Sequence, residues 1–494
     1  MALSAEIVQR IKDAVGSENA SADDFVLVTY GKSIDHTHDW KLPGLVVKPG
    51  NAEQVARVLR ICSELEVPVI PRGGGTSLTN GVLPDRDDTV VMDLMGLNKI
   101  HEINTEVGYA VVDVGVTWGQ LDKELRQYGY YVGQGAAGAG SGTAIGGGLS
   151  QNSVGAGGST KHDCASYSCL GLEVALASGE IIKTGAWLNE YVTKPFKRYG
   201  LGPDWTGLFL GDPGTLAVKT KAVMKIYHKP PYHRCKTFKV PNGVAVANKV
   251  MQAWHSGEWG IWEAVHIPTH VANIFGGFEI YKPFAHTQDD VLFYITQSFT
   301  KEGLDSNVKE LDKIALDHGC VPYGDEISEG NLAKYHYEEQ GYWRFYHPFW
   351  GAYGPNSNVM VWVFDVPIDD YASTAKTLLD WYEKNLDRFL KMPGGFGYVG
   401  FMTPTGVKVV SGCPSMADDE TMGLRREVYE DLIEVFLRDC HGFPGWSDMS
   451  YSRKAVDIGA YSPEHINFMR SIKNTLDPNG ILSPGKFYFG KDGR

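Results

Sequence analysis

Several features that would assign this chain to a particular class of protein are missing from it. The seven cysteines are an odd number, lie far apart and form no Cys-x-x-Cys pair, so neither a zinc site nor a disulfide framework is indicated. No apolar run approaches the roughly 18 residues of a membrane span. Residues 1–12 indicate an amphipathic helix without the basic-then-apolar layout of a signal peptide. We therefore expect a cytoplasmic protein with no membrane partner.

Basic residues are outnumbered by acidic ones. The 46 Lys and Arg residues against 59 Asp and Glu residues give a formal charge of −13, which disfavours nonspecific binding to nucleic acid. The composition, 43% hydrophobic and 21% charged, is that of a globular protein, and 494 residues suffice for two or three domains. We expect no nucleic-acid partner.

The glycine-rich segment 72–81 lacks two common nucleotide-binding motifs. It has neither the Lys-Ser/Thr pair of a Walker loop nor the G-x-G-x-x-G of a dinucleotide fingerprint. It follows an apolar strand pattern and contains three consecutive glycines and then two hydroxyl side chains. Such a backbone lets N–H groups converge on an anion, so we interpret it as a pyrophosphate loop, with an ordinary turn as the alternative.

A second stretch, 133–158, consists almost entirely of small residues. Small side chains let the backbone approach a large flat ligand closely, whereas a disordered linker is the alternative interpretation. Two such loops in one half of the chain favour ligand binding.

The periodicity predicts an α+β fold. Short apolar strands alternate with helical patterns up to about residue 171, and the composition changes at 229–231, after which aromatic residues are frequent. We place the domains at 1–228, 229–455 and 456–494.

The order of short motifs from residue 72 to residue 486 resembles the vanillyl-alcohol oxidase and para-cresol methylhydroxylase family of flavoproteins. The matching segments are 72–81, 97–100, 114–120, 152–155, 199–203, 207–209 and 476–486. The resemblance implies an FAD-dependent oxidase or dehydrogenase. Its FAD would be held by a two-subdomain α+β module, completed by the C-terminal segment, under an α+β cap with an antiparallel sheet.

The resemblance also implies which residues bind FAD. They are Arg72, Gly73, Gly74, Gly75, Thr76, Ser77, Leu78, Gly138, Ser141, Thr143, Gly146, Gly147, Asn152, Ser153, Gly155, Gly214, Ala217, Val218, Asn479 and Lys486. Many family members link FAD covalently through a histidine beside the first loop, or a histidine or tyrosine before the cap glycine strand. Segments 72–75 and 388–393 contain no His, Tyr or Cys, so we expect dissociable FAD.

The cap resembles the phenol-oxidising branch of the family. Segment 343–355 is similar to that branch's aromatic strand and 394–401 to its glycine strand. The sister branch oxidises D-2-hydroxy acids and usually carries a metal-binding H-x-G-D-G-N-x-H run, which this chain lacks. We expect an aromatic alcohol or para-substituted phenol as substrate, a bulky lignin-related compound being one candidate, and no metal.

Substrate contacts depart from those of the phenol branch, where tyrosines and an arginine hold a phenolate. The comparable positions here are Thr79 and the Trp446-Ser447 pair, although a small shift would restore a Tyr451 and Arg453 pair. Further candidates in the cap are Arg344, Tyr346, His347 and Tyr353, although aromatic stripes are more often core than pocket.

The acid/base candidates are His162 and Asp163, because the family places an acidic residue shortly after the Asn-Ser loop and a histidine titrates near neutral pH. The alternative interpretation is that His162 and Asp163 are surface loop residues without a role in the reaction. A carboxylate grip by Arg344 or Arg453 would instead favour a D-2-hydroxy acid or sugar-like alcohol. A flavin-binding protein without turnover is a further alternative. The electron acceptor is O2 or a separate acceptor, and a homodimer is the default assembly.

Overall fold

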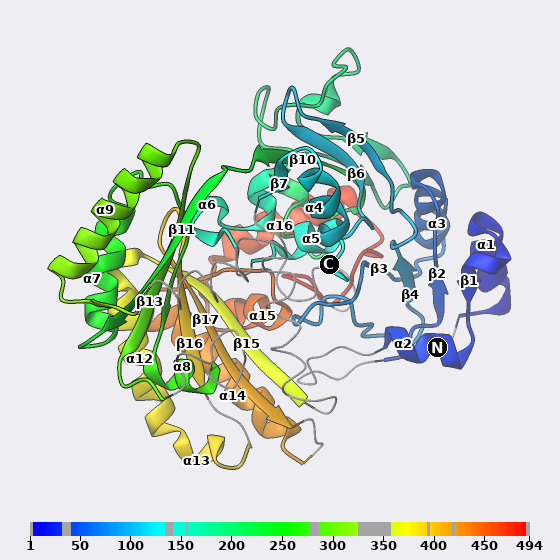
Figure 1. The fold of residues 1–494 in the computed structure, drawn as a ribbon. Helices are drawn as coiled ribbons and strands as arrows, with labels where there is room; N and C mark the ends of the chain where they lie inside the picture. The colour runs from blue at the N-terminus through cyan, green and yellow to red at the C-terminus, as the bar shows by residue number, and fades with distance from the viewer. Residues whose placement is uncertain are drawn as a thin grey trace.

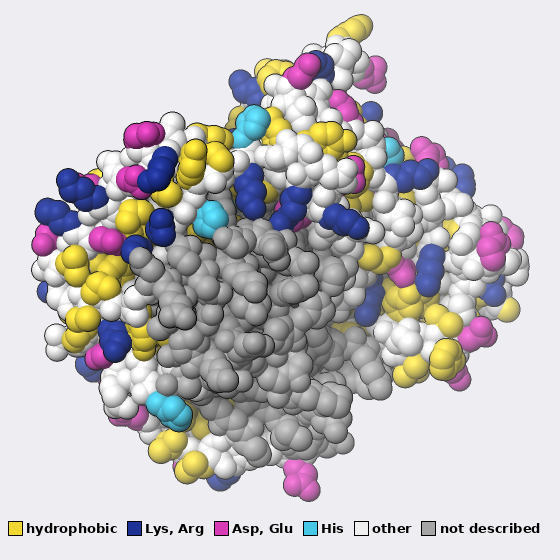
Figure 2. Space-filling view, in the orientation of Figure 1, with side chains coloured by type: hydrophobic (Ala, Val, Ile, Leu, Met, Phe, Trp, Pro, Cys, Tyr) yellow, Lys and Arg dark blue, Asp and Glu magenta, His cyan; other side chains and the backbone are white. Residues whose placement is uncertain are grey.

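The computed structural model describes residues 3–31, 41–133, 142–154, 157–275, 284, 286–324, 357–392, 396–416 and 420–490. The fold is α+β, with two smaller sheets in an FAD-binding module and an eight-stranded sheet in a cap domain. In Figure 1 the cap sheet lies on the left and the two smaller sheets lie at the top and right. On the coloured part of the face in Figure 2, acidic and basic side chains are interspersed.

The first sheet of the module has the order β1-β2-β4-β3, and β2, β4 and β3 run parallel. Its strands are β1 (Ala20–Ser21), β2 (Leu45–Val47), β3 (Val69–Arg72) and β4 (Val90–Asp93). Its helices are α1 (Ala5–Val15), α2 (Asp24–Tyr30) and α3 (Ala52–Glu64), with a 3-10 turn η1 (Ser17–Asn19). Helix α3 begins after Asn51, whose side chain accepts from Gln54 N, and buries the apolar face that its 3.6-residue period predicts.

The second sheet is antiparallel, with the order β5-β6-β10-β8-β9 and β7 beside β10. Its strands are β5 (Ile100–Asn104), β6 (Tyr109–Asp113), β7 (Tyr130–Val132), β8 (Cys169–Ala175), β9 (Ile181–Lys183) and β10 (Val218–His228). Between them lie α4 (Trp118–Arg126), α5 (Ile145–Gln151), α6 (Ser159–His162), η2 (Ala165–Ser168), η3 (Gly185–Leu188) and η4 (Gly207–Phe209). Helix α4 begins at a capping box that Thr117 and Gln120 form.

The cap sheet has the order β14-β11-β13-β12-β16-β17-β15-β18. Its strands are β11 (Tyr232–Val240), β12 (Ile261–Ile267), β13 (Asp290–Ser298), β14 (Val321–Pro322), β15 (Ser357–Val366), β16 (Gly397–Met402), β17 (Val407–Met416) and β18 (Phe443–Pro444). Its helices are α7 (Val244–His255), α8 (Thr269–Phe275), α9 (Lys301–Asp317), α12 (Tyr371–Lys384), α13 (Leu386–Phe389), α14 (Met422–Arg438) and α15 (Met449–Asp457), with η7 (Ile368–Asp370) before α12.

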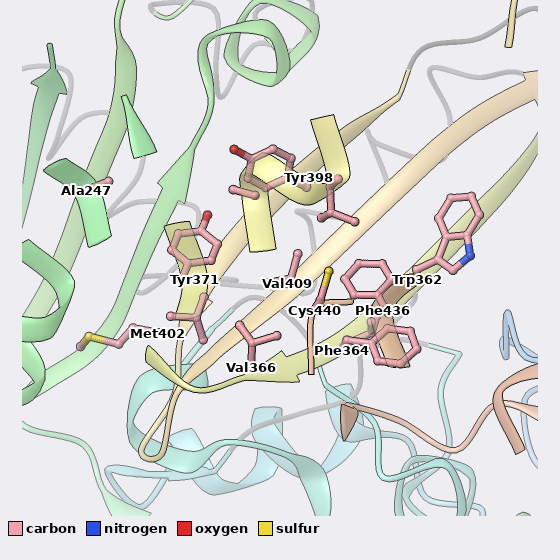
Figure 3. Close-up of a cluster of buried hydrophobic side chains, with 14 of the residues drawn as sticks. Ala247, Trp362, Phe364, Val366, Tyr371, Tyr398, Met402, Val409, Phe436 and Cys440 are labelled. Atoms are coloured by element: carbon pink, nitrogen blue, oxygen red, sulfur yellow. The ribbon is translucent and has the colours of Figure 1, made fainter. Parts of the chain in front are cut away.

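Aromatic side chains from strand β15 and helix α14 form much of the cap core (Figure 3). Phe364 and Phe436 stack with their ring centroids 4.4 Å apart. The same apolar cluster includes Val154 and has Leu78 packed against it, so it extends from the cap to the glycine loops of the module.

The C-terminal segment returns to the FAD-binding module. Helix α16 (Pro463–Leu476) lies among the elements of the N-terminal half in Figure 1. After it, Leu482 pairs in parallel with Val69 of β3. Fully buried Lys473 donates to Asp477 Oδ2 (2.6 Å), Thr215 O (2.8 Å) and Leu482 O (2.9 Å), which fixes the segment against the module.

Candidate functional site

The first glycine loop leaves β3 in a conformation that favours glycine. Gly75 has φ +68°, and a Cβ there would lie 2.3 Å from the Arg72 guanidinium. That guanidinium stacks 5.1 Å from the centre of the Tyr30 ring and donates to Tyr30 O at 3.1 Å. A Cβ at Gly74 would lie 1.7 Å from Gly142 O. Any larger residue would therefore force this loop away from the second one.

The two predicted loops lie against each other. Thr76 Oγ1 and Thr143 Oγ1 are 2.8 Å apart, and a Cβ on Gly73 would contact the Ala144 side chain at 3.0 Å. Gly146 packs against Val114, whereas a Cβ on Gly147 would meet no atom within 4 Å. The contact between the loops therefore leaves open space beside Gly147.

The residues of this contact fit the pyrophosphate of FAD. The backbone N–H groups of Gly73, Gly74, Gly75 and Thr76 donate to no residue that the structure describes. These four donors are available to an anionic group, and together they would form the cradle that a pyrophosphate requires. FAD, when bound, supplies a ring that accepts a hydride.

Other residues predicted to bind FAD lie around these loops. Asn152 ends α5 in the left-handed conformation, and Ser153 N donates to Gly148 O at 2.8 Å. Gly214 has φ +71° and packs on Pro71, while Ala217 and Val218 are buried in the module's cores.

The two predicted residues of the C-terminal segment lie at different places. Lys486 is buried and pairs with Asp85 at 3.1 Å. Asn479 Nδ2 donates to Ser63 O (2.9 Å) near the end of α3. Seven predicted site residues lie outside the described residues: Gly138, Ser141, Gly155, Arg344, Tyr346, His347 and Tyr353.

The predicted substrate positions Thr79 and Trp446-Ser447 come together around Gln151, the last residue of α5. Thr79 Oγ1 donates to Gln151 Oε1 at 2.6 Å, and Ser447 N donates to Gln151 O at 2.9 Å. Ser447 Oγ also donates to Gly211 O at 2.7 Å. Sequence analysis missed Gln151, and its only signal is its place directly before the Asn-Ser pair.

Tyr451 and Arg453 serve different neighbours. The Tyr451 hydroxyl accepts from Val363 N of β15 at 2.8 Å, and complete burial raises its pKa well above the ordinary value. Arg453 Nη2 donates to Gly485 O of the C-terminal segment at 2.9 Å. Trp446 is buried in the same cluster as Tyr451.

Comparison with known proteins gives the family. The FAD binding domain family matches residues 43–185, and the C-terminal domain of FAD linked oxidases matches residues 459–487. An uncharacterized FAD-linked oxidoreductase of Mycobacterium tuberculosis is 30% identical over 490 residues, which cover 97% of this chain and 98% of that protein. The chain belongs to the FAD-linked oxidoreductases.

One further relative matches about half of the chain, and one solved structure shares its fold. The glycolate oxidase subunit GlcD of Bacillus subtilis is 33% identical over 226 residues, which are 46% of this oxidoreductase and only 45% of that subunit. The 4-ethylphenol oxidase of Gulosibacter chungangensis has the same fold, with a TM-score of 0.81, 18% identity and coverage of 100% and 99% of the two chains. The two matched family models and the relative that matches nearly the whole chain make this oxidoreductase an FAD-linked oxidase or dehydrogenase.

His162, the first acid/base candidate, is buried within the FAD-binding module. Its Nε2 lies 3.0 Å from the Tyr131 hydroxyl, and its ring lies 4.4 Å from that of Tyr227. Burial, with smaller contributions from Lys161 and Lys225, lowers its pKa to about 3. The imidazole is therefore neutral and a weak proton acceptor at neutral pH.

Asp163 lies at the junction of the module and the cap. Its carboxylate pairs with Lys408 of β17 at 2.7 Å, and Lys408 also lies 3.5 Å from Asp365 of β15. Burial raises the pKa of Asp365 to about 6, with Lys408 opposing the shift and Asp163 adding to it. The roles of His162 and Asp163 in the reaction stay predictions.

Among the described residues, no group of three His, Cys, Asp or Glu side chains is arranged to hold a metal ion. Within the same residues, no helix has the length and apolar character needed to cross a membrane.

Proposed function

We propose that this oxidoreductase oxidises an aromatic alcohol or a para-substituted phenol by transfer of a hydride to the FAD. The observation that carries the proposal is that Leu78, Val154 and Trp446, here called the apolar patch, belong to one apolar cluster that reaches the two glycine loops. Leu78 belongs to the first loop, and Val154 follows the Asn-Ser pair of the second. An apolar environment of this kind suits an aromatic ring.

Polar groups at one side of the patch suit an oxygen substituent on the ring. Thr79 follows Leu78, Ser447 follows Trp446, and both bond to Gln151. The protein would hold the ring between these groups and the patch, so that the reacting carbon is presented to the cofactor in one orientation.

Oxidation of a D-2-hydroxy acid or a sugar-like alcohol is the second candidate. The likeness to the glycolate oxidase subunit favours it. A carboxylate substrate needs a cation within hydrogen-bond reach. Of the two arginines considered for that role, Arg453 already donates to the Gly485 carbonyl, and Arg344 lies outside the described residues.

We propose further that FAD is bound without a covalent link, because segment 72–79 offers no nucleophilic His, Tyr or Cys beside the cradle. A homodimer in the cytoplasm, passing electrons to O2 or a separate acceptor, completes the proposal.

Visible spectroscopy tests these statements. The purified protein is precipitated with acid, and intact protein is treated anaerobically with vanillyl alcohol, 4-ethylphenol or D-lactate. A yellow supernatant and bleaching by a phenol or aromatic alcohol are expected. Colour retained in the pellet would contradict dissociable FAD, and bleaching by D-lactate alone would replace the proposal with the hydroxy-acid function.

A further inference from the structure

The side-chain amide of Gln151 is held in a single orientation. Thr79 Oγ1 donates to Gln151 Oε1 at 2.6 Å, and the Thr79 hydroxyl lies 2.7 Å from Ser77 Oγ. Ser77 Oγ also accepts from Thr79 N at 3.1 Å. Because the amide oxygen is occupied by this chain of hydroxyls, the amide nitrogen is left as the group that can bind a ligand.

The Gln151 backbone is fixed as well. Its carbonyl accepts from Ser447 N at 2.9 Å, and Ser447 Oγ donates to Gly211 O at 2.7 Å. Three segments far apart in the sequence therefore meet at this residue. A side chain supported in this way loses little conformational entropy when it binds a ligand.

The Gln151 Nε2 group donates to none of the residues that the structure describes. It faces Gly81, where an added Cβ would lie 2.8 Å from Nε2 and 3.9 Å from Met449 Cε. The side chain is only half-buried. Glycine at position 81 therefore lets the Gln151 amide lie against the backbone, and among the described residues this amide nitrogen has no acceptor.

The partners of Gln151 each adjoin the apolar patch, since Leu78 precedes Thr79 and Trp446 precedes Ser447. Among the described side chains that bond to Gln151 or form the patch, none carries a positive charge. An amide N–H can donate to a neutral ether or hydroxyl oxygen, and with no cation among these side chains the bound oxygen is not required to carry a charge.

We propose that Gln151 is a specificity-determining residue whose amide N–H binds a neutral oxygen substituent, a hydroxyl or a methyl ether, on the ring of the substrate. The proposal rests on the aromatic-substrate function proposed above. It means that the ring oxygen does not have to ionise, so an O-methylated substrate is accepted as well as a free phenol.

Two benzylic alcohols that differ by one atom test the role of Gln151. The para substituent of 4-methoxybenzyl alcohol has an ether oxygen where that of 4-ethylbenzyl alcohol has a methylene group. Anaerobic flavin reduction is followed by stopped flow for the wild type, Gln151→Leu and the exposed-site control Gln9→Leu. One neutral hydrogen bond should contribute about 2- to 10-fold to the rate ratio of ether to ethyl compound, beyond the intrinsic electronic effect of the methoxy group, which all variants share.

Gln151→Leu should lower this rate ratio by about 2- to 10-fold and keep its FAD, and Gln9→Leu should keep the wild-type ratio. Gln151→Glu, which keeps the size of the side chain and loses the amide donor, should lower the ratio as well. A purely structural role would lower both rates together and would overturn the proposal.

Other outcomes overturn the inference in distinguishable ways. Loss of FAD from Gln151→Leu would assign the residue to the cofactor cradle. A wild type that oxidises 4-hydroxybenzyl alcohol only as its phenol ionises, and rejects the methyl ether, would refute the neutral-oxygen role while keeping the aromatic-substrate function. A wild type reduced by none of these alcohols would refute both.

Discussion

Lys473 should be one of the most stability-sensitive residues of the chain. It is fully buried, and its ammonium group donates to Asp477, Thr215 and Leu482. Lys473→Met would leave the buried Asp477 carboxylate without its cation and two carbonyls without a donor. Removal of one partner from a buried ion pair typically lowers the free energy of unfolding by about 3–5 kcal/mol. The loss should be accompanied by weaker FAD binding, because the segment containing Leu482 pairs with β3 directly before the glycine loop.

The assay is urea unfolding of the holoprotein followed by tryptophan and flavin fluorescence. Lys301→Met is the matched control, because Lys301 forms an exposed pair with Asp305, and such pairs contribute about 0–1 kcal/mol. The double variant Lys473→Met with Asp477→Asn should recover part of the loss, since it removes the uncompensated charge. A Lys473→Met variant as stable as Lys301→Met would refute the argument.

Two further predictions concern the glycine loops and His162. Gly74→Ala should impair both folding and FAD binding, because its Cβ meets the Gly142 carbonyl. Gly147→Ala places its Cβ in open space, so it should keep the stability of the apoprotein and weaken FAD binding. Thermal melts with and without FAD distinguish the two variants, and equal behaviour would contradict the cradle. For His162, burial lowers the pKa from 6.5 to about 3, so between these values only the unfolded chain takes up the proton and stability falls as the pH falls through this window. Urea midpoints from pH 4 to 7 should fall less steeply for His162→Gln than for the wild type, and parallel slopes would show that another group is responsible.

Local signals predicted much of the secondary structure. The helix over 51–65, the threonine cap before α4 and the hairpin of β8 and β9 follow from periodicity, capping chemistry and a Ser-Gly turn, which act between near neighbours in the chain. The helical pattern that continues through 371–389 is divided at Asn385 into α12 and α13. The break between β10 and β11 falls at the Pro-Pro pair of 230–231, where the missing N–H groups prevent sheet pairing.

The sequence by itself also determined that two glycine-rich loops are present, because glycine takes a positive φ at the least cost and lets another backbone approach closely. Only the tertiary structure decided which side chains meet at those loops. Thr79 and Ser447 converge on Gln151, while the Tyr451 hydroxyl is used by strand β15. Such contacts depend on the packing of the cap against the module and of the C-terminal segment against β3, and no periodicity or local motif encodes a contact between segments so far apart in the chain.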